Sequence, residues 1–203
     1  MRVLLLHLDG KIPNIALMRL AWHHRMSGDE VVLRRADNPR LLEKRLKNDL
    51  ASWNLDSWDR VYGSLIFERT KPMAETLLKY RSDVILGGTG WEVASSLESL
   101  GITTNKQDYS IYPEWQQSIG FSQRGCRLRC SFCVVPRKEG AVREIQSIWD
   151  IWRGDPWPRE ILLLDNDFFG QPNWGKRIDE LKEGKFKVSF NQGINARMLT
   201  DET

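Results

Sequence analysis

The first hundred residues alternate compact apolar runs with stretches of helical periodicity. Apolar runs of the kind that form strands buried on both faces occupy residues 2–9, 30–35, 60–67 and 83–88. Helical patterns lie between and after them, at residues 15–26, 39–50, 74–80 and 92–100. In the first helical pattern, the apolar positions expected on one face are Ile15, Met18, Trp22 and Met26. Strands separated by helices predict right-handed crossovers and a parallel sheet covered on both faces.

A second alternating series follows a polar, aromatic-containing segment. Strands are expected at 118–122, 160–165 and 185–191, with helices at 142–153 and 174–184. This order is typical of the opening half of a parallel α/β barrel or of an open α/β sheet. We therefore expect an α/β protein with three parts. These are a Rossmann-like domain over 1–103, a connecting segment over 104–117, and a second domain over 118–203.

Composition adds few restrictions to this picture. Hydrophobic residues make up 41% and charged residues 28% of the chain, which is ordinary for a globular protein. The formal net charge of +3 is too small an excess to indicate nucleic acid as a partner. No apolar run approaches the roughly 20 residues that a membrane helix needs. Without a recognisable export signal, the expected location is the reducing cytoplasm, where thiols stay free for metals or catalysis.

The chemistry of the chain is concentrated in one segment, RGCRLRCSFCVVPRKEG at 124–140, which holds all three cysteines. Cys126, Cys130 and Cys133 form the pattern C-x-x-x-C-x-x-C among basic residues, and their odd number leaves no closed disulfide framework. A structural zinc site usually takes four ligands, and the histidines all lie in the first domain. The same shortage of histidine argues against a nucleophilic cysteine. Three thiolates suit an iron–sulfur cluster in which one iron keeps an open coordination position.

CRLRCSFC, with Phe132 before the last cysteine, resembles the signature of the radical S-adenosylmethionine (radical SAM) enzymes. GFSQRGC, VVPRKEG, LLLDNDFF, FNQGINARMLT, DVILGGTGW and DYSIYPE are similar to stretches in members with a cobalamin-binding-like N-terminal domain. The resemblance implies that Cys126, Cys130 and Cys133 bind a [4Fe–4S] cluster and that Phe132 lies against the adenine of SAM. It also implies that the second domain is the first half of a radical SAM partial TIM barrel. In the family, an electron donor reduces the cluster, which cleaves SAM to methionine and a 5′-deoxyadenosyl radical.

Further candidate ligands of SAM follow the second and third strands of the second domain. Residues after the second barrel strand hold the amino group of SAM in the family, and this place is taken here by Asp165, Asn166 and Asp167. A polar turn that ends a buried strand explains the same residues equally well. After the third strand, the candidate contacts to SAM or substrate are Asn191, Gln192, Asn195 and Arg197, although a loop network accounts for them too. The sequence identifies no catalytic side chain and no substrate.

Three other features carry weaker signals. Residues 87–90, GGTG, follow a strand, and a tight turn explains them better than a phosphate site does. Arg143 resembles a family position but is equally explained as a solvated charge at the start of a helix. Related domains supply a cobalamin ligand through D-x-H-x-x-G, whereas residues 7–14 read HLDGKIPN. We therefore expect no cobalamin.

The sequence is compatible with two functions. The first is a radical SAM enzyme, or its N-terminal portion, with SAM and a reducing electron donor as partners. The alternative is a non-catalytic iron–sulfur or zinc-binding α/β module. Radical SAM barrels ordinarily have six strand–helix units, and this chain supplies three strands before Thr200 or Asp201, where a further helix is expected to begin. We expect a portion of a barrel that associates with its other half, or with itself, through an open sheet edge.

Overall fold

The computed structural model describes residues 1–36, 50 and 52–199. The chain divides into two units, Met1–Pro113 and Glu114–Thr203. Most of the helix expected at 39–50, and the helix start expected at Thr200 or Asp201, lie outside the described residues. Within the described part, no helix is long and apolar enough to cross a membrane.

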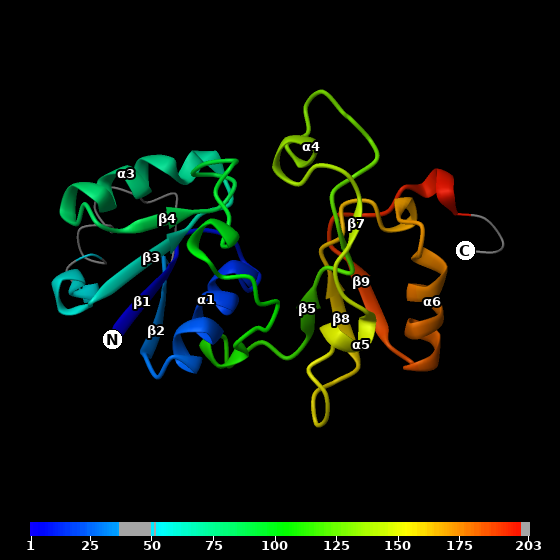
Figure 1. Cartoon of the computed structure of the whole chain (residues 1–203), viewed down its shortest axis with the longest axis horizontal. Coiled ribbons are helices and arrows are strands. Elements are labelled where there is room, and N and C mark those ends of the chain that lie inside the picture. Colours follow the sequence, from blue (N-terminus) through cyan, green and yellow to red (C-terminus); the bar gives the residue numbers. More distant parts are fainter. Residues whose placement is uncertain (37–49, 51, 200–203) are drawn as a thin grey trace. The chain divides into compact units, whose positions relative to one another are not determined.

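The first unit contains a four-stranded parallel sheet, and the expected α/β class is confirmed. Its strands are β1 (Arg2–His7), β2 (Glu30–Arg35), β3 (Arg60–Ser64) and β4 (Ile85–Gly87), in the order β2-β1-β3-β4. Its longer helices are α1 (Ile15–Met26) and α3 (Lys71–Tyr80), which Figure 1 shows on opposite sides of the sheet. This arrangement is the one that right-handed crossovers produce when the chain first adds a strand on one side of β1 and then on the other.

The apolar run of β1 is buried on both faces of this sheet. Leu4, Leu6 and Leu8 belong to a core cluster that also contains Met73 and Leu77 of α3. Helix α1 also buries one side, which matches the expected face only in part: Met18 is buried, Ile15 and Trp22 are half-buried, and Met26 is exposed. Its buried residues are Leu17, Met18, Leu20, Ala21 and His24.

The prediction for α1 failed because it counted only apolar residues, whereas the buried face also contains a histidine, His24. Met26 is 69% exposed, whereas His24 is 3% exposed. The two ring nitrogens of His24 lie 2.7 Å from Asp29 Oδ2 and 3.0 Å from Tyr62 Oη. Since both nitrogens have partners, this polar ring can be buried at little cost.

The helix expected at 92–100 is absent, and turns occupy that segment up to the short 3₁₀ helix η3 (Glu98–Leu100). In this segment a serine hydroxyl forms hydrogen bonds with backbone groups. Ser95 Oγ accepts the N–H of Gly88 at 3.1 Å and donates to the carbonyl of Glu92 at 2.9 Å. Local bonds of this kind compete with the helical ladder, and the periodicity of the apolar residues does not reveal them.

The second unit is built on a three-stranded parallel sheet in the order β5-β8-β9. The strands are β5 (Ser118–Gly120), β8 (Glu160–Leu163) and β9 (Lys187–Phe190), and α6 (Trp174–Glu183) follows β8. Buried residues from the strands and helices of this unit form one core cluster. Its members are Ile148, Ile151, Ile161, Leu163, Phe168, Phe169, Leu181 and Phe186. The strands and helix expected at 118–122, 160–165, 174–184 and 185–191 are therefore confirmed in type and approximate position.

The helix expected at 142–153 is wrong over its first half. Arg143–Glu144 form β7, which pairs antiparallel with β6 (Gln123–Arg124). The helix of this segment, α5, spans only Ile148–Ile151. It begins at Ser147, which forms a capping box with Asp150. Arg143 therefore lies on a strand and not in a helix.

A buried arginine joins β7 to α6. The Arg177 side chain is 1% exposed and lies between Glu144, at 2.5 Å, and Glu180, at 2.8 Å. Glu180 also accepts the N–H of Ile148 at 2.8 Å, which fixes the start of α5. These bonds attach the two-stranded ribbon to the body of the second unit.

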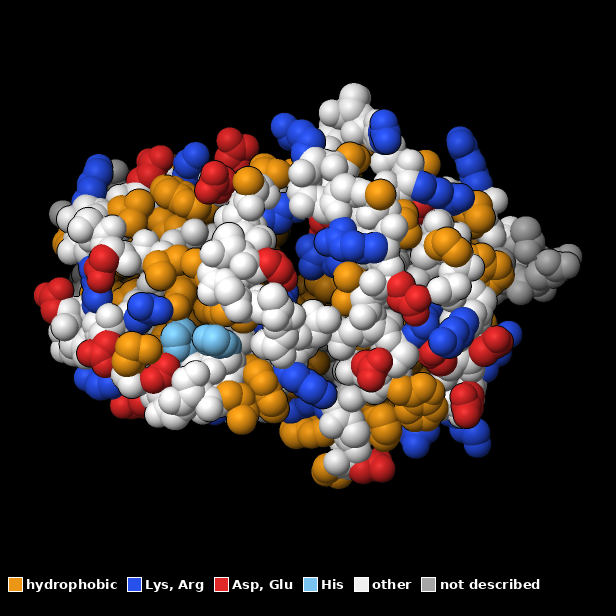
Figure 2. All heavy atoms as spheres, viewed as in Figure 1, with side chains coloured by type: hydrophobic (Ala, Val, Ile, Leu, Met, Phe, Trp, Pro, Cys, Tyr) orange, Lys and Arg blue, Asp and Glu red, His pale blue; other side chains and the backbone are white. Residues whose placement is uncertain are grey.

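The outer strand of this sheet is partly open. Among the described strands, β9 pairs with β8 alone. Lys187 and Ser189 are exposed, whereas Val188 and Phe190 are half-buried. On the face drawn in Figure 2, basic, acidic and hydrophobic side chains are interspersed over this unit.

Candidate functional site

The three parallel strands of the second unit end level with one another. Gly120 pairs with Leu163, and Leu163 pairs with Phe190. The ladder continues for one more step, because Leu164 donates to Gly120 at 2.9 Å and Asn191 donates to Leu163 at 2.9 Å. The segments that follow the strands therefore emerge at one edge, which is where ligands bind in parallel α/β sheets.

The cysteines lie on a loop, residues 125–142, that we call the cysteine loop. The β6–β7 ribbon closes its two ends, and the N–H of Cys126 donates to Gly140 O at 3.4 Å. Gly125 adopts φ +83°, and a Cβ built there would lie 2.2 Å from Ala141 O. Only glycine allows the two ends of the loop to approach this closely.

Glu139 joins the ends of the cysteine loop to the segment after β8. One carboxylate oxygen lies 2.6 Å from Arg124 Nη2. The other accepts the N–H of Gly125 at 2.9 Å and the side-chain amide of Asn166 at 2.8 Å. Sequence reasoning missed this residue. The available signal was a single acid within the basic stretch VVPRKEG.

The three thiols are free and accessible. Cys126 and Cys133 are half-buried and Cys130 is exposed. Between Cys130 and Cys133 the loop makes a tight turn, with the N–H of Cys133 3.0 Å from Cys130 O. Among the residues that the structure describes, no three His, Cys, Asp or Glu side chains converge to hold a metal ion, the three cysteines included. The ring of Phe132 is 91% exposed.

Burial raises the pKa of the Cys126 thiol, and the negative charges of Asp167, Cys133 and Cys130 raise it further. Basic neighbours ordinarily lower the pKa of a thiol, but burial is the larger influence at Cys126, and the guanidinium of Arg127 is paired with Asp167 at 2.9 Å.

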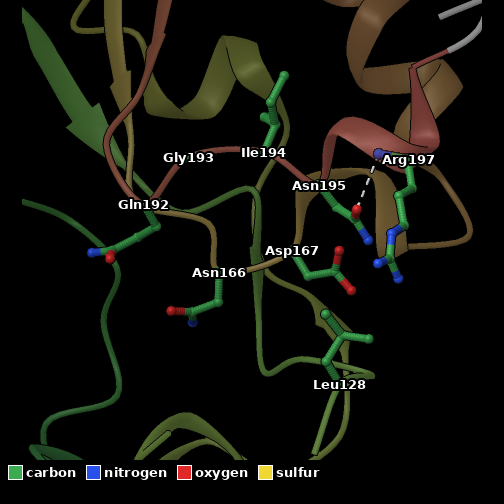
Figure 3. A pocket seen from close by; sticks show the side chains of 8 residues that line it. All are labelled: Leu128, Asn166, Asp167, Gln192, Gly193, Ile194, Asn195 and Arg197. Atoms are coloured by element: carbon green, nitrogen blue, oxygen red, sulfur yellow. Dashed lines mark hydrogen bonds between the residues drawn. The ribbon is translucent and has the colours of Figure 1, made fainter. Parts of the chain in front are cut away.

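A pocket of about 350 Å³ lies at the same edge of the sheet (Figure 3). It is lined by Leu128 of the cysteine loop, by Asn166 and Asp167, and by Gln192, Gly193, Ile194, Asn195 and Arg197. Figure 3 shows Asn166 and Gln192 projecting to one side, and Asp167, Asn195 and Arg197 gathered on the other. The structure thus brings together five of the predicted ligand residues: Asn166, Asp167, Gln192, Asn195 and Arg197. Sequence reasoning did not name Leu128, Gly193 or Ile194.

Asp167 is held firmly at the wall of this pocket. Its side chain is 2% exposed and accepts from Arg127 Nε at 2.9 Å. A Cβ built on Gly170 would lie 2.0 Å from Asp167 Oδ2, so glycine at 170 leaves the space that the carboxylate fills. Arg127 and Asp167 form a second link between the cysteine loop and the pocket.

Asp165 is buried, and it does not line the pocket. Its carboxylate accepts the N–H of Ser122 at 2.8 Å, the hydroxyl of Ser122, and the N–H of Gln123 at 3.3 Å. Burial raises its pKa to about 6, and the charge of Glu139 adds to the increase, while the bonds from Ser122 and Gln123 oppose it. Asp165 therefore fixes the strand end that leads into the cysteine loop.

Asp165 gives the second unit a specific pH dependence. Its ordinary pKa is 3.8 and its folded pKa is about 6, so the folded chain binds this proton more tightly than the unfolded chain does. The stability that Asp165 contributes is present below about pH 4 and is lost as the pH rises through about 6. From about pH 4 to about pH 7, the wild type should lose roughly 2–3 kcal/mol of unfolding free energy relative to Asp165→Asn. Urea unfolding across this range measures the difference. Asp179→Asn, at an exposed aspartate of α6, is the control, and a constant difference between wild type and Asp165→Asn would contradict the prediction.

In the first unit, glycines within residues 87–90 allow this segment to pack closely against the backbone of residues 65–67. A Cβ on Gly88 would lie 2.1 Å from Leu65 O. Asp9 fixes the same segment from another direction by accepting the N–H groups of Ile66 and Phe67, at 2.7 and 2.9 Å. This geometry favours the tight turn over a phosphate site.

His7 is also buried in the first unit. Its Nδ1 lies 3.0 Å from Tyr112 Oη. Burial and the charge of Arg35 lower its pKa to about 4, so the ring is neutral near pH 7.

The fold resembles that of a known radical SAM enzyme. The solved structure of the radical S-adenosylmethionine methyltransferase TsrM from Kitasatospora setae, with tryptophan substrate and the SAM analogue aza-SAM bound, matches with a TM-score of 0.56. The match covers 90% of this chain and 50% of that chain at 14% sequence identity. The likeness is one of fold. This chain spans about half the length of TsrM. No protein-family model matches the sequence, and no curated protein matches it.

Proposed function

We propose that the chain is a radical SAM protein, or the N-terminal portion of one, that binds a [4Fe–4S] cluster and SAM at the edge described above. The observation that carries the proposal is the position of the cysteine loop. It leaves the first strand of a parallel sheet whose next two strands lead into a polar pocket, and Leu128 of the loop lines that pocket. The likeness in fold to a radical SAM methyltransferase supports the same proposal.

The donor set fits the cluster in number and in chemistry. Its ligands would be Cys126, Cys130 and Cys133. All three thiols are free, and none of them is fully buried. With three thiolates bound, the cluster would keep one iron for SAM and would supply the electron that cleaves it. The three thiols do not converge in the described structure, so binding a cluster would require the cysteine loop to close around it.

The pocket residues would bind and orient SAM. Asn166, Asp167, Gln192 and Arg197 offer amide, carboxylate and guanidinium groups, which suit the amino and carboxylate ends of an amino acid. Phe132, whose ring is free of packing on this loop, would lie against the adenine. We assign Asp165 a positioning role through Ser122 in place of the direct contact expected from the sequence. The absence of cobalamin and the need for a reducing electron donor stay predictions.

The test is the response of a reduced cluster to SAM. After anaerobic reconstitution with iron and sulfide, the electron paramagnetic resonance (EPR) spectrum of the reduced protein should change when SAM is added. A non-catalytic iron–sulfur module would take up iron but show no change with SAM. A zinc module would bind stoichiometric zinc and no iron. Either of these results would reject the proposal.

A further inference from the structure

We propose that Glu139 is a positioning residue that couples the cysteine loop to the SAM pocket and thereby sets the affinity for SAM. It would do so without contacting the cluster or SAM. This inference rests on the proposed function and adds to it a residue that neither the sequence motif nor the pocket lining identifies.

The first argument is the number and origin of the donors around one carboxylate. Arg124 belongs to β6, at the start of the loop, and Gly125 is the first loop residue. Asn166 belongs to the segment after β8 and lines the pocket. A single side chain, itself only 10% exposed, therefore holds three donors on two distant segments at distances of 2.6–2.9 Å.

The second argument is that the backbone of Glu139 is fixed as well. Its carbonyl oxygen accepts from Arg143 Nη1 of β7 at 2.5 Å. The residue is therefore tied to both strands of the ribbon that closes the loop. A shift of the loop relative to the pocket would have to break a bond at Glu139.

The other link between the loop and the pocket is weaker. Arg127 pairs with Asp167, but the Arg127 side chain is 40% exposed, and solvent screens such a pair. In the pair of Glu139 with Arg124 the arginine is less exposed, at 27%, and Glu139 accepts two further bonds, from Gly125 and Asn166. Because three donors meet its carboxylate, Glu139 is the stronger of the two links.

Glutamine at 139 has nearly the same shape but the wrong hydrogen-bonding capacity. Its amide has one oxygen and an NH₂ group, whereas the three groups around Glu139 all donate. The NH₂ group would face a donor, and at least one bond would be lost. We expect Glu139→Gln to keep its fold and its three cysteine ligands but to hold Asn166 and the loop less closely together.

The experiment compares Glu139→Gln with the matched control Glu183→Gln, which removes the same charge at an exposed position of α6 in the same unit. SAM is titrated into each reduced, reconstituted protein and followed by the EPR change. Glu139→Gln should weaken SAM binding roughly 10- to 100-fold, the range found when the residues that orient metal ligands are removed. Glu183→Gln should bind SAM like the wild type.

Asn166→Ala and the double variant Glu139→Gln/Asn166→Ala complete a double-mutant cycle. If Glu139 acts through Asn166, the affinity of the double variant for SAM should equal that of whichever single variant binds SAM less tightly. Additive losses would show that the two residues act independently and would overturn the coupling.

Hydrogen exchange on the unreconstituted proteins gives a readout that does not need the cluster. Amides of residues 125–142 and 164–167 should exchange faster in Glu139→Gln than in the wild type, while those of β5, β8 and β9 should not change. Unchanged exchange in these segments, or SAM binding equal to the wild type, overturns the inference alone. If wild-type protein loads a cluster but does not respond to SAM, the proposed function fails, and the inference falls with it.

Discussion

Replacing any one of Cys126, Cys130 and Cys133 by alanine is expected to abolish cluster assembly. Each thiolate is a third of the protein's ligand set, and the chain holds no fourth cysteine to replace it. Iron and acid-labile sulfide should fall from about four each per wild-type chain to near zero in each variant. Both are measured after anaerobic reconstitution and removal of unbound iron.

The structure supplies a control for this experiment in the same loop. Ser131 is exposed and lies between Cys130 and Cys133, so Ser131→Ala should take up iron like the wild type. The cysteine variants should keep the circular dichroism of the wild type, because none of the three thiols is fully buried. A variant that still holds a stable, complete cluster would show that its cysteine is not a ligand.

The strands of this protein could be predicted from the sequence because their signal is local. The run at 2–9 is apolar throughout, which is what a strand buried on both faces requires, and it forms β1. The helix expected at 142–153 failed for the opposite reason. Arg143 pairs with Arg124, and Glu144 pairs with Gln123, so partners far along the chain override the local helical pattern.

In the candidate site, too, the features that depend on local sequence could be predicted, and those that depend on distant residues could not. The spacing of the cysteines is a local pattern and was visible in the sequence. The run Asp165-Asn166-Asp167 was also visible, but not the direction of each side chain. Asp165 faces Ser122, Asn166 faces Glu139, and Asp167 faces Arg127.

Glu139 was missed because its partners are distant in the sequence. They lie 14, 15 and 27 positions away, and nothing in the order of residues pairs them. Its role follows only from the closure of the loop, which depends in turn on Gly125.

Gly125→Ala should prevent the loop from closing, whereas Gly140→Ala should not. Both glycines have positive φ, +83° and +73°, so alanine at either position costs roughly 1–2 kcal/mol of backbone strain. They differ in the space around them. A Cβ on Gly125 would lie 2.2 Å from Ala141 O and 2.8 Å from Gly140 O, whereas a Cβ on Gly140 meets nothing within 4 Å.

The obstacle at Gly125 is backbone, so no side-chain rotation can relieve it. The ends of the loop must separate, and this breaks the bond from the N–H of Gly125 to Glu139 and the pairing of Arg124 with Arg143. Because Cys126 is the next residue, its thiol moves away from Cys130 and Cys133. We expect Gly125→Ala to retain less than about a tenth of the wild-type iron, a loss in the range seen when the groups that orient metal ligands are removed. Gly140→Ala should load almost normally. Iron content after reconstitution, with urea unfolding to compare the two stabilities, measures both. Equal loading of the two variants would mean that steric closure at Gly125 does not control the site and that backbone strain alone accounts for any loss.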